Sequence, residues 1–456
     1  MSDATAKKEE RRKFQAIRGT RDLLPPETEL WNRVEQTAHE VFSTFGYGEI
    51  RPPIFEQTDL FARAVGGDTD IVSKEMYSFS DERSEPPELA TRHSPPATSI
   101  SLRPEATASV CRAYIEHHIQ QLPQPVKLYY MGPMFRRERP QKGRYRQFYQ
   151  IGAEILGGTD APAIDAEVIE MLMTYFDKVG LPGAMLYINS IGHNAENCRR
   201  GYIAQLKSAL EKVKDQLGPD SQRRIDTNPL RVLDSKLESE QPIIATLPHI
   251  ADHLCDECKA HYAAVKRQLE LRGVLYQENW RLVRGLDYYM RTTFEITAPG
   301  LGSQNAVCGG GRYDGLVELL GGPPTNGIGF AIGEDRLILS LQEKAKLEGP
   351  NSPLATRHSP LLYIAWMGEH AYAAAIRAAK GLRNAGFSVE LPPVEQKFGK
   401  ALGQADKLGA KYALILGDNE VAEGLWTLKT LLTGEQQKFP EPELLEFLRQ
   451  QKKMSP

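Results

Sequence analysis

The chain has 456 residues, more than one ordinary core accommodates, and this length predicts about three domains. Its composition, with 41% hydrophobic and 25% charged residues, is typical of a soluble globular enzyme and excludes a fibre or a largely disordered chain. A formal net charge of −3 gives no general basic field, so any binding of nucleic acid must depend on local patches.

The N-terminal residues 1–13 are polar and of mixed charge, without the apolar region of a secretory signal. No apolar run approaches the roughly 20 residues that a membrane-spanning helix needs. The five cysteines are scattered, which argues against a disulfide framework and fits a reducing compartment. We therefore expect a cytoplasmic protein with no membrane segment.

The first predicted element is an amphipathic helix at residues 30–45, whose apolar side chains recur at helical spacing. Gly46 ends this helix, and an extended stretch then runs from Tyr47 to Pro52 and Pro53. Proline cannot donate to a strand ladder, so it is typical of the edge or the end of a strand.

Residues 80–100 are rich in Ser, Pro and Glu and predict a flexible surface insert. The segment LATRHSP occurs there at 89–95 and again, identically, at 354–360. Both copies lie in Pro/Ser-rich stretches, so we interpret them as tolerated insertions without a function.

The most informative stretch, residues 126–157, predicts a strand VKLYYMGPMF, a basic loop and a second strand YRQFYQIGAEIL. Side chains alternate between the faces of a strand, and one face of the second strand carries mostly core residues. The other face offers cations for phosphates, a ring for stacking, a gap and polar groups, namely Arg144, Arg146, Phe148, Gln150, Gly152 and Glu154. A solvated hairpin face accounts for the charges equally well, so the residues alone leave both interpretations open.

The rest of the chain predicts further domains. Residues 195–270 become polar and helical, which predicts a helical insertion within a first domain of residues 1–345. A linker is predicted at 346–360. Beyond it, strand and helix patterns alternate, which predicts a small α/β domain at 361–456, with strands at 361–366, 387–391 and 412–416 and helices at 369–384 and 399–408.

One metal-like motif lies in the helical insertion. Cys255 and Cys258 form a CxxC, and His261 follows three residues later. Zinc sites of this kind need a fourth ligand and usually a second pair, and none is evident in the sequence. We therefore interpret these cysteines as structural and predict no metal site.

Several segments carry a resemblance that covers nearly the whole chain. FRRERPQKGRYRQF (135–148) resembles motif 2 of histidyl-tRNA synthetases, and GIGFAIGEDR (327–336) resembles motif 3 of this class II family. RGLDYYMRTTFE (284–295) is similar to its histidine-specific signature, and GGGRYDGL (309–316) to the companion segment, where three glycines would allow close backbone approach to a ligand. The helix and strand at residues 30–53 resemble motif 1. The resemblance implies an α+β catalytic domain with an antiparallel sheet, a helical insertion and a C-terminal α/β anticodon-binding domain.

The same resemblance implies roles in binding ATP. Arg136 would hold the α-phosphate, and Arg336 would lie over the adenine and contact the γ-phosphate. Phe148 would stack on the other face of the base, and Arg144 would also bind ATP. Arg284 would bridge the histidine carboxylate and the α-phosphate, so Arg284, Arg136 and Arg336 are the expected catalytic residues, with Mg²⁺ entering only with ATP.

Histidine recognition is implied for a second set of residues. Glu154 would accept from one imidazole nitrogen and Tyr289 would meet the other, with Tyr288 alongside. The amino group would be held by residues of the LRPEATA segment (102–108) and the hairpin, namely Glu105, Ala106, Thr107 and Gln150. Two positions depart from the family pattern: Asp335 stands where Glu is usual, and Ala106 where Gly is common.

The partners that follow are tRNA-His, ATP, L-histidine and a second copy of the chain. The alternative is a catalytically silent relative, the synthetase-like regulatory subunit of the first enzyme of histidine biosynthesis. That relative typically lacks the C-terminal domain and erodes the motif 2 arginines, whereas this chain keeps residues 361–456 together with Arg136 and Arg144.

Overall fold

The computed structural model describes residues 14–67, 69–80, 99–181, 183–301, 305–348 and 361–454. The chain divides into two compact units, residues 1–355 and 356–456. The two LATRHSP copies and the insert around them lie outside the described residues, as does most of the predicted linker. The first three linker residues, 346–348, instead belong to the last helix of the first unit. Among the described residues, we find no helix with the length and apolarity that a bilayer crossing requires.

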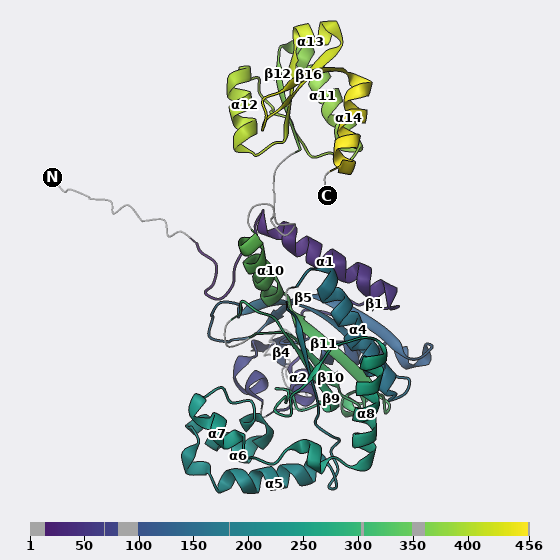
Figure 1. Ribbon diagram of the computed structural model, residues 1–456, viewed down its shortest axis with the longest axis vertical. Helices are drawn as coiled ribbons and strands as arrows, with labels where there is room; N and C mark the ends of the chain where they lie inside the picture. Colours follow the sequence, from purple (N-terminus) through teal and green to yellow (C-terminus); the bar gives the residue numbers. More distant parts are fainter. Residues whose placement is uncertain are drawn as a thin grey trace, which may run out of the picture. The chain divides into compact units, whose positions relative to one another are not determined.

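The first unit is built on an eight-stranded sheet (Figure 1). In spatial order its strands are β1 (Gly48–Glu49), β5 (Val126–Phe135), β6 (Gln147–Leu156), β11 (Gly327–Gly333), β10 (Ala306–Arg312), β9 (Met290–Thr297), β7 (Met185–Ser190) and β8 (Gln277–Glu278). The inner strands pair antiparallel, as predicted, but the short edge strands β1 and β8 pair parallel with β5 and β7. The sheet is therefore mixed and not purely antiparallel.

One face of this sheet is the core of the unit. Residues that pair directly across neighbouring strands point to the same face, and Ile151, Ile332, Cys308 and Ile296 form one such row. All are buried together with residues of the four helices that cover this face, α1 (Glu27–Thr44), α4 (Pro162–Lys178), α8 (Asp256–Leu271) and α10 (Glu334–Glu348). The opposite face of the sheet carries the candidate active site.

A small layer covers part of that opposite face. It contains a three-stranded sheet of β2 (Phe55–Gln57), β4 (Ser99–Leu102) and β3 (Ser78–Ser80), and the helices α2 (Thr58–Val65), α3 (Thr107–Glu116) and α9 (Leu316–Leu319). Phe61, Val110 and Val317 from the three helices share one apolar cluster with Tyr130 of β5. This packing fixes the start of α3 above the sheet.

The helices of the insertion lie together, apart from the sheet (Figure 1). They are α5 (Arg199–Glu211), α6 (Pro219–Thr227) and α7 (Gln241–Ile244), with short 3₁₀ turns between them. The insertion has an apolar core of its own, in which Leu206, Leu210 and Leu217 are buried and Val213 packs against them.

The second unit has a five-stranded sheet in the order β13 (Val389–Glu390), β12 (Leu362–Met367), β14 (Tyr412–Gly417), β15 (Leu425–Thr430) and β16 (Gln436–Pro440). Alternate residues of β12 enter two cores: Leu362 and Ile364 pack with α11 (Glu369–Asn384) and α14 (Glu441–Met454). Tyr363 and Ala365 pack on the other face with α12 (Phe398–Lys407). The short helix α13 (Asp418–Glu423) completes this α/β unit.

Candidate active site

The floor of the site is a row of very small residues across the inner strands. Glu154 pairs with Gly329, which pairs with Gly311, and the next row contains Gly152, Ala331 and Gly309. A Cβ atom on Gly329 would lie 1.7 Å from a carboxylate oxygen of Glu154, and one on Gly309 would lie 2.1 Å from a guanidinium nitrogen of Arg284. The glycines therefore make room for the large side chains that lie flat on the sheet.

This packing corrects two expectations from the sequence. The gap predicted at Gly152 is filled, because a Cβ there would lie 2.3 Å from the Tyr130 ring. The glycines of the 309–311 segment were expected to let backbone approach a ligand. Instead, a Cβ on Gly310 would meet Phe294 and one on Gly311 would meet Tyr289. In both places the protein's own side chains occupy the space.

A buried carboxyl group lies at the base of the site. Glu154 is only 1% exposed, and it accepts hydrogen bonds from the hydroxyls of Thr107 at 2.7 Å and Tyr313 at 2.5 Å. Burial raises its pKa to about 8, although these two hydrogen bonds act in the opposite direction. A carboxylate has about four lone-pair positions, so it can accept further N–H groups from a ligand.

A second carboxyl group lies at the start of α3. Glu105 is buried and accepts from the backbone N–H groups of Thr107 at 2.7 Å and Ala108 at 3.0 Å, so it caps the helix. Burial raises the pKa of Glu105, and these backbone donors oppose the shift. Ala106 is fully buried within the apolar cluster around α3. Thr107 donates its hydroxyl hydrogen to Glu154, which leaves the oxygen lone pairs to face an amino group.

Gln150 lies on the same face of β6 as Glu154, four residues earlier in the strand. Its side-chain oxygen is buried and makes no hydrogen bond within the described protein. A buried acceptor without a donor costs free energy on the order of 1–3 kcal/mol. A ligand ammonium group would therefore find an acceptor here that is already desolvated.

Tyr288 and Tyr289 lie in the loop that precedes strand β9 and are not part of a strand themselves. Their ring centroids lie 4.7 Å apart, and the Tyr288 ring also meets Tyr313 edge-on at 5.7 Å. Burial raises the pKa of both Tyr288 and Tyr289, so their hydroxyls stay protonated and available as donors. The structure thus brings both tyrosines next to the group of Thr107, Tyr313 and Glu154.

Arg284 lies over Gly309 and faces the middle of the sheet. Its guanidinium carbon is 5.7 Å from the Tyr289 ring centroid, and its Nη1 donates to Glu295 of β9 at 3.2 Å. Its Nε is buried without a hydrogen-bond partner in the described protein. The ion pair thus joins Arg284 of the loop before β9 to Glu295 within that strand.

The remaining arginines line a cleft at the loop end of the β5–β6 hairpin. A cavity of about 170 Å³ is bordered by Arg136, Arg144, Phe148 and Arg336. A second hollow of about 530 Å³ shares Arg144 and Arg336 and contains Glu295. The two adjoining cavities share these two arginines and carry more cationic than anionic side chains, which suits a polyanion.

Within this cleft Arg136 and Arg144 each make a defined contact with the protein. Arg136 donates from Nε to the Pro104 carbonyl at 3.0 Å, and its guanidinium carbon lies 5.2 Å from the centroid of the Phe148 ring. Arg144 pairs with Glu138 at 3.2 Å. Burial and the neighbouring Arg144 lower the pKa of Arg336, so an anion bound between these two arginines would relieve their repulsion.

The carboxylates near the cleft differ in what they can still bind. Asp335 accepts from Arg21 at 3.1 Å and from the Tyr149 backbone N–H at 2.8 Å, which ties α10 to strand β6. Glu138 and Glu295 each pair with an arginine at the edge of the cleft. Carboxylates beside expected phosphates are the ligands that Mg²⁺ uses when it enters with a nucleotide, so this border fits such an ion.

Sequence reasoning missed two residues of the buried group. Tyr313 donates to Glu154, and Tyr130 fills the space above Gly152. Tyr313 stands in the GGGRYDGL segment, so a signal was present, but only the fold brings that segment beside β6. Tyr130 lies on the first predicted strand and showed no pattern that separates it from a core residue.

Known proteins resemble this chain in both sequence and structure. The family model of histidyl-tRNA synthetase matches residues 19–337, and that of an anticodon binding domain matches residues 362–451. A histidine–tRNA ligase of Koribacter versatilis (strain Ellin345) is 53% identical over 440 residues, which cover 96% of each chain. One from Solibacter usitatus (strain Ellin6076) is 52% identical and covers 94% of this chain and 98% of its own. The crystal structure of apo S. aureus histidyl-tRNA synthetase superposes with a TM-score of 0.75 at 38% identity, over 95% of this chain and 99% of that one.

Proposed function

The chain belongs to the histidyl-tRNA synthetase family, and we propose that the site described above carries out both steps of that chemistry. In the first step L-histidine and ATP give histidyl-adenylate and diphosphate. In the second step histidine passes to tRNA-His and AMP leaves. The chain is thus an aminoacyl-tRNA synthetase, and we place its activity in the cytoplasm, where tRNA is charged.

This proposal rests on one observation, that two sites of different chemistry lie next to each other on one face of the sheet. The buried carboxyl of Glu154 lies at one end, the arginine-lined cleft lies at the other, and Arg284 lies near both. A small amino acid with an ammonium group and a ring N–H can therefore be bound beside a polyanionic nucleotide. Holding two reactants in attack geometry supplies much of the rate of a reaction that needs no general base.

The histidine carboxylate is the nucleophile in adenylation, and it is already ionised at neutral pH. Catalysis then requires that negative charge on the α-phosphate be neutralised as the new bond forms. We assign this role to Arg136 and Arg284, with Arg144 and Arg336 holding the rest of the triphosphate. Planar guanidinium groups suit this task because they bind phosphate with two parallel N–H bonds.

Recognition of histidine follows from the buried carboxyl group. We propose that Glu154 accepts an imidazole N–H while Thr107 and Tyr313 hold its oxygens in place. Tyr289 would meet the other ring nitrogen, with Tyr288 beside it. The α-amino group would lie between Glu105, Thr107 and Gln150, where the buried Gln150 oxygen needs a donor.

Mg²⁺ belongs to this reaction as the partner of ATP. The carboxylates at the border of the cleft, Glu138 and Glu295, are the groups that would hold it, and the ion would supply charge neutralisation on the β- and γ-phosphates. All other steps assigned here depend on side chains of the chain itself.

The second unit is proposed to bind the anticodon of tRNA-His. Residues 361–456 carry 12 Lys and Arg against 11 Asp and Glu, so recognition must use local contacts and not a general basic field.

We also propose a homodimer that uses the region of residues 30–53. The apolar side of helix α1 is buried within its own chain, so this helix can contact a partner only through its exposed polar side. The adjoining Ile54 and Phe55 are exposed, with 59% of Phe55 accessible, and they supply apolar surface instead. Closed twofold interfaces of this kind are the commonest among soluble proteins.

The regulatory-subunit alternative is not favoured. The curated relatives at 53% and 52% identity are ligases over almost their full lengths. The arginines that such a subunit erodes are present here and line one cleft.

The full two-step activity can be tested by mixing the full-length chain with labelled histidine, ATP, Mg²⁺ and tRNA-His. We expect acid-precipitable label to accumulate on the tRNA, with AMP formed in equal amount. Label that does not depend on ATP, or that fails to reach tRNA-His, would contradict the proposal.

A further inference from the structure

A cluster of three cysteines and one histidine lies at the base of the helical insertion. The ligand atoms of His193, Cys198, Cys255 and Cys258 all lie within 4.8 Å of one another. Nδ1 of His193 is 3.1 Å from Sγ of Cys258 and 3.7 Å from Sγ of Cys255. None of the four residues takes part in the site described above.

We propose that this cluster is a closed, four-coordinate Zn²⁺ site. Three thiolates and one imidazole are a typical ligand set of structural zinc, and a Zn–S bond of about 2.3 Å implies tetrahedral sulfur separations of about 3.8 Å. With all four ligand atoms already within 4.8 Å of one another, only a small contraction would give this geometry. On binding, each thiol gives up its proton, so up to three protons are released for each ion bound.

The backbone around the cluster is arranged to bring the ligands together. Gly192 has φ +63°, and a Cβ there would lie 2.6 Å from Sγ of Cys198, so the turn needs glycine. Backbone N–H groups of Ala195 and Arg199 donate to the His193 carbonyl at 2.9 and 3.2 Å, which folds the turn back on itself. Cys255 directly precedes helix α8, and Cys258 lies in its first turn.

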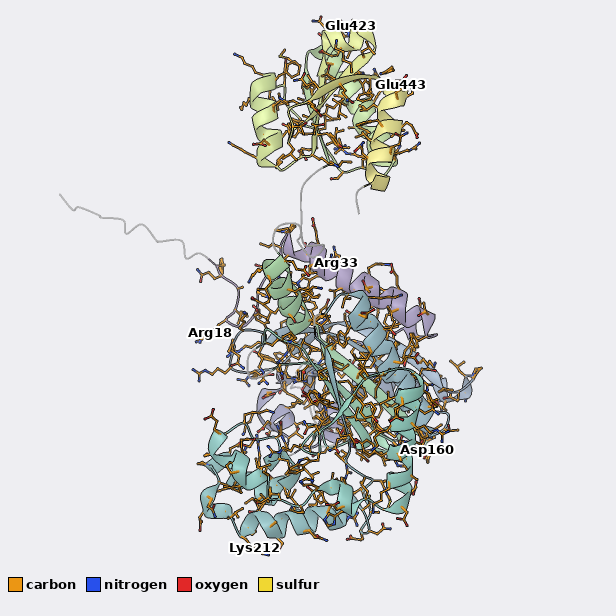
Figure 2. The ribbon with its side chains drawn as sticks, viewed as in Figure 1. Arg18, Arg33, Asp160, Lys212, Glu423 and Glu443 are labelled. Atoms are coloured by element: carbon orange, nitrogen blue, oxygen red, sulfur yellow. The ribbon has the colours of Figure 1, made fainter. Side chains whose placement is uncertain are left out.

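The surroundings also fit the charge of an occupied site. Three thiolates and Zn²⁺ carry a net charge of −1, which nearby cations can balance. Arg199 follows Cys198 directly, is largely buried, and donates to the Tyr289 carbonyl. Arg291, also close to the thiols, is already paired with Glu257 of α8 and with Asp160, which lies beside α8 (Figure 2), so Arg199 supplies the balancing charge.

The CxxC motif of Cys255 and Cys258 shows only two of the four ligands, because the other two lie far away in the chain. His261, the residue nearest to the CxxC, instead bonds to the Asp160 carbonyl at 3.1 Å and lies near Asp165. His193 and Cys198 complete the set from the loop after strand β7. The ion would thus join the two ends of the insertion, and through Arg199 it would steady the backbone at Tyr289.

The test uses the full-length chain, purified without chelators from cells supplied with zinc. We expect about one equivalent of zinc per chain by elemental analysis, released when an organomercurial reagent modifies the thiols. Replacement of zinc by Co²⁺ should give the strong visible bands of a tetrahedral thiolate site.

The matched variants are His193→Ala, which removes a proposed ligand, and His261→Ala, which removes the histidine suggested by sequence spacing. His193→Ala should lose most of the zinc, whereas His261→Ala should keep it. Cys258→Ser should lose it and Cys111→Ser should keep it, since Cys111 is buried elsewhere.

Several results would overturn the proposal. Wild-type protein that stays well below one equivalent after reconstitution with zinc would do so, as would a disulfide between these cysteines in the intact mass. Visible absorption from an iron–sulfur cluster would replace zinc by another metal centre. If the ligand variants aggregate, the wild-type stoichiometry and thiol-coupled release still decide the question.

Discussion

Replacing Arg284 with alanine tests the charge-neutralising role most sharply. The structure predicts a small effect on folding, because the Arg284–Glu295 pair is 3.2 Å long and both side chains are partly exposed, at 21% and 30%. Solvent screening limits such pairs to about 0–1 kcal/mol. The loss should therefore appear in the reaction and not in the stability of the protein.

The expected loss of rate is much larger. An arginine that contacts both the carboxylate and the α-phosphate stabilises charge that is more concentrated in the transition state than in bound substrates. Removing one preorganised donor of this kind lowers turnover by about 10²–10³, or roughly 2.7–4 kcal/mol, and a full charge exceeds this. Arg284→Lys should recover only part of the loss, because an ammonium group cannot copy the two-pronged contact.

The assay is single-turnover formation of adenylate, with histidine and ATP affinities measured separately. Arg272→Ala is the matched control, because Arg272 pairs with Glu170 at 3.0 Å and similar exposure but lies outside the site. We expect Arg284→Ala to bind both substrates and barely react, while the control reacts normally. Near wild-type adenylation by a folded Arg284→Ala protein would refute the role assigned to this residue.

Four further outcomes follow from the same geometry. The folded pKa of Glu154, about 8, lies above its ordinary value, so its stabilising contribution is full at acid pH and is lost as pH rises through 8. In denaturant titrations without ligand, Glu154→Gln should therefore show a smaller decline in the free energy of unfolding between pH 5 and 8 than the wild type. The variant should also fail to bind histidine. Parallel pH profiles of the variant and the wild type would contradict this. Phe55→Glu should dissociate the dimer, as measured by sedimentation at micromolar concentration. The control Leu275→Glu, at a side chain that is 85% exposed, should leave the dimer intact. A dimer that persists in both variants would exclude the surface around Phe55 as the interface. Removing residues 361–456 should abolish tRNA charging yet leave much of the histidine-dependent pyrophosphate exchange, and equal loss of both in a folded protein would argue against an anticodon domain. Deleting residues 84–98 should leave Tm and the KM for ATP within a small factor, and a large rise in KM would give this insert a role in the site.

The elements with strong local patterns could be predicted from the sequence. Strand β5 and helix α11 have the predicted bounds, because an apolar alternation or a helical stripe is bounded by clear turn residues. The core face of β6 was also correct, since Ile151, Ala153 and Ile155 are all buried. The C-terminal strands β15 and β16 were missed.

The geometry of the site depended on contacts between distant segments. The Gly309–Gly311 run suggested room for a ligand, yet Arg284 and Phe294 fill much of that room. Similarly, the hydroxyl of Tyr313 reaches Glu154 only because β10 and β6 flank the same strand. Spacing along the chain could not reveal either contact, because both depend on strand order.

On this account, one face of the sheet joins a histidine pocket to a nucleotide cleft. Exchange of labelled pyrophosphate into ATP, measured across a panel of amino acids without tRNA, tests it most directly. We predict exchange with histidine and none above background with glutamine or phenylalanine, which cannot satisfy the buried Glu154 and its tyrosine neighbours in the same way. Exchange that is independent of histidine, or equal for all three amino acids, would contradict the account.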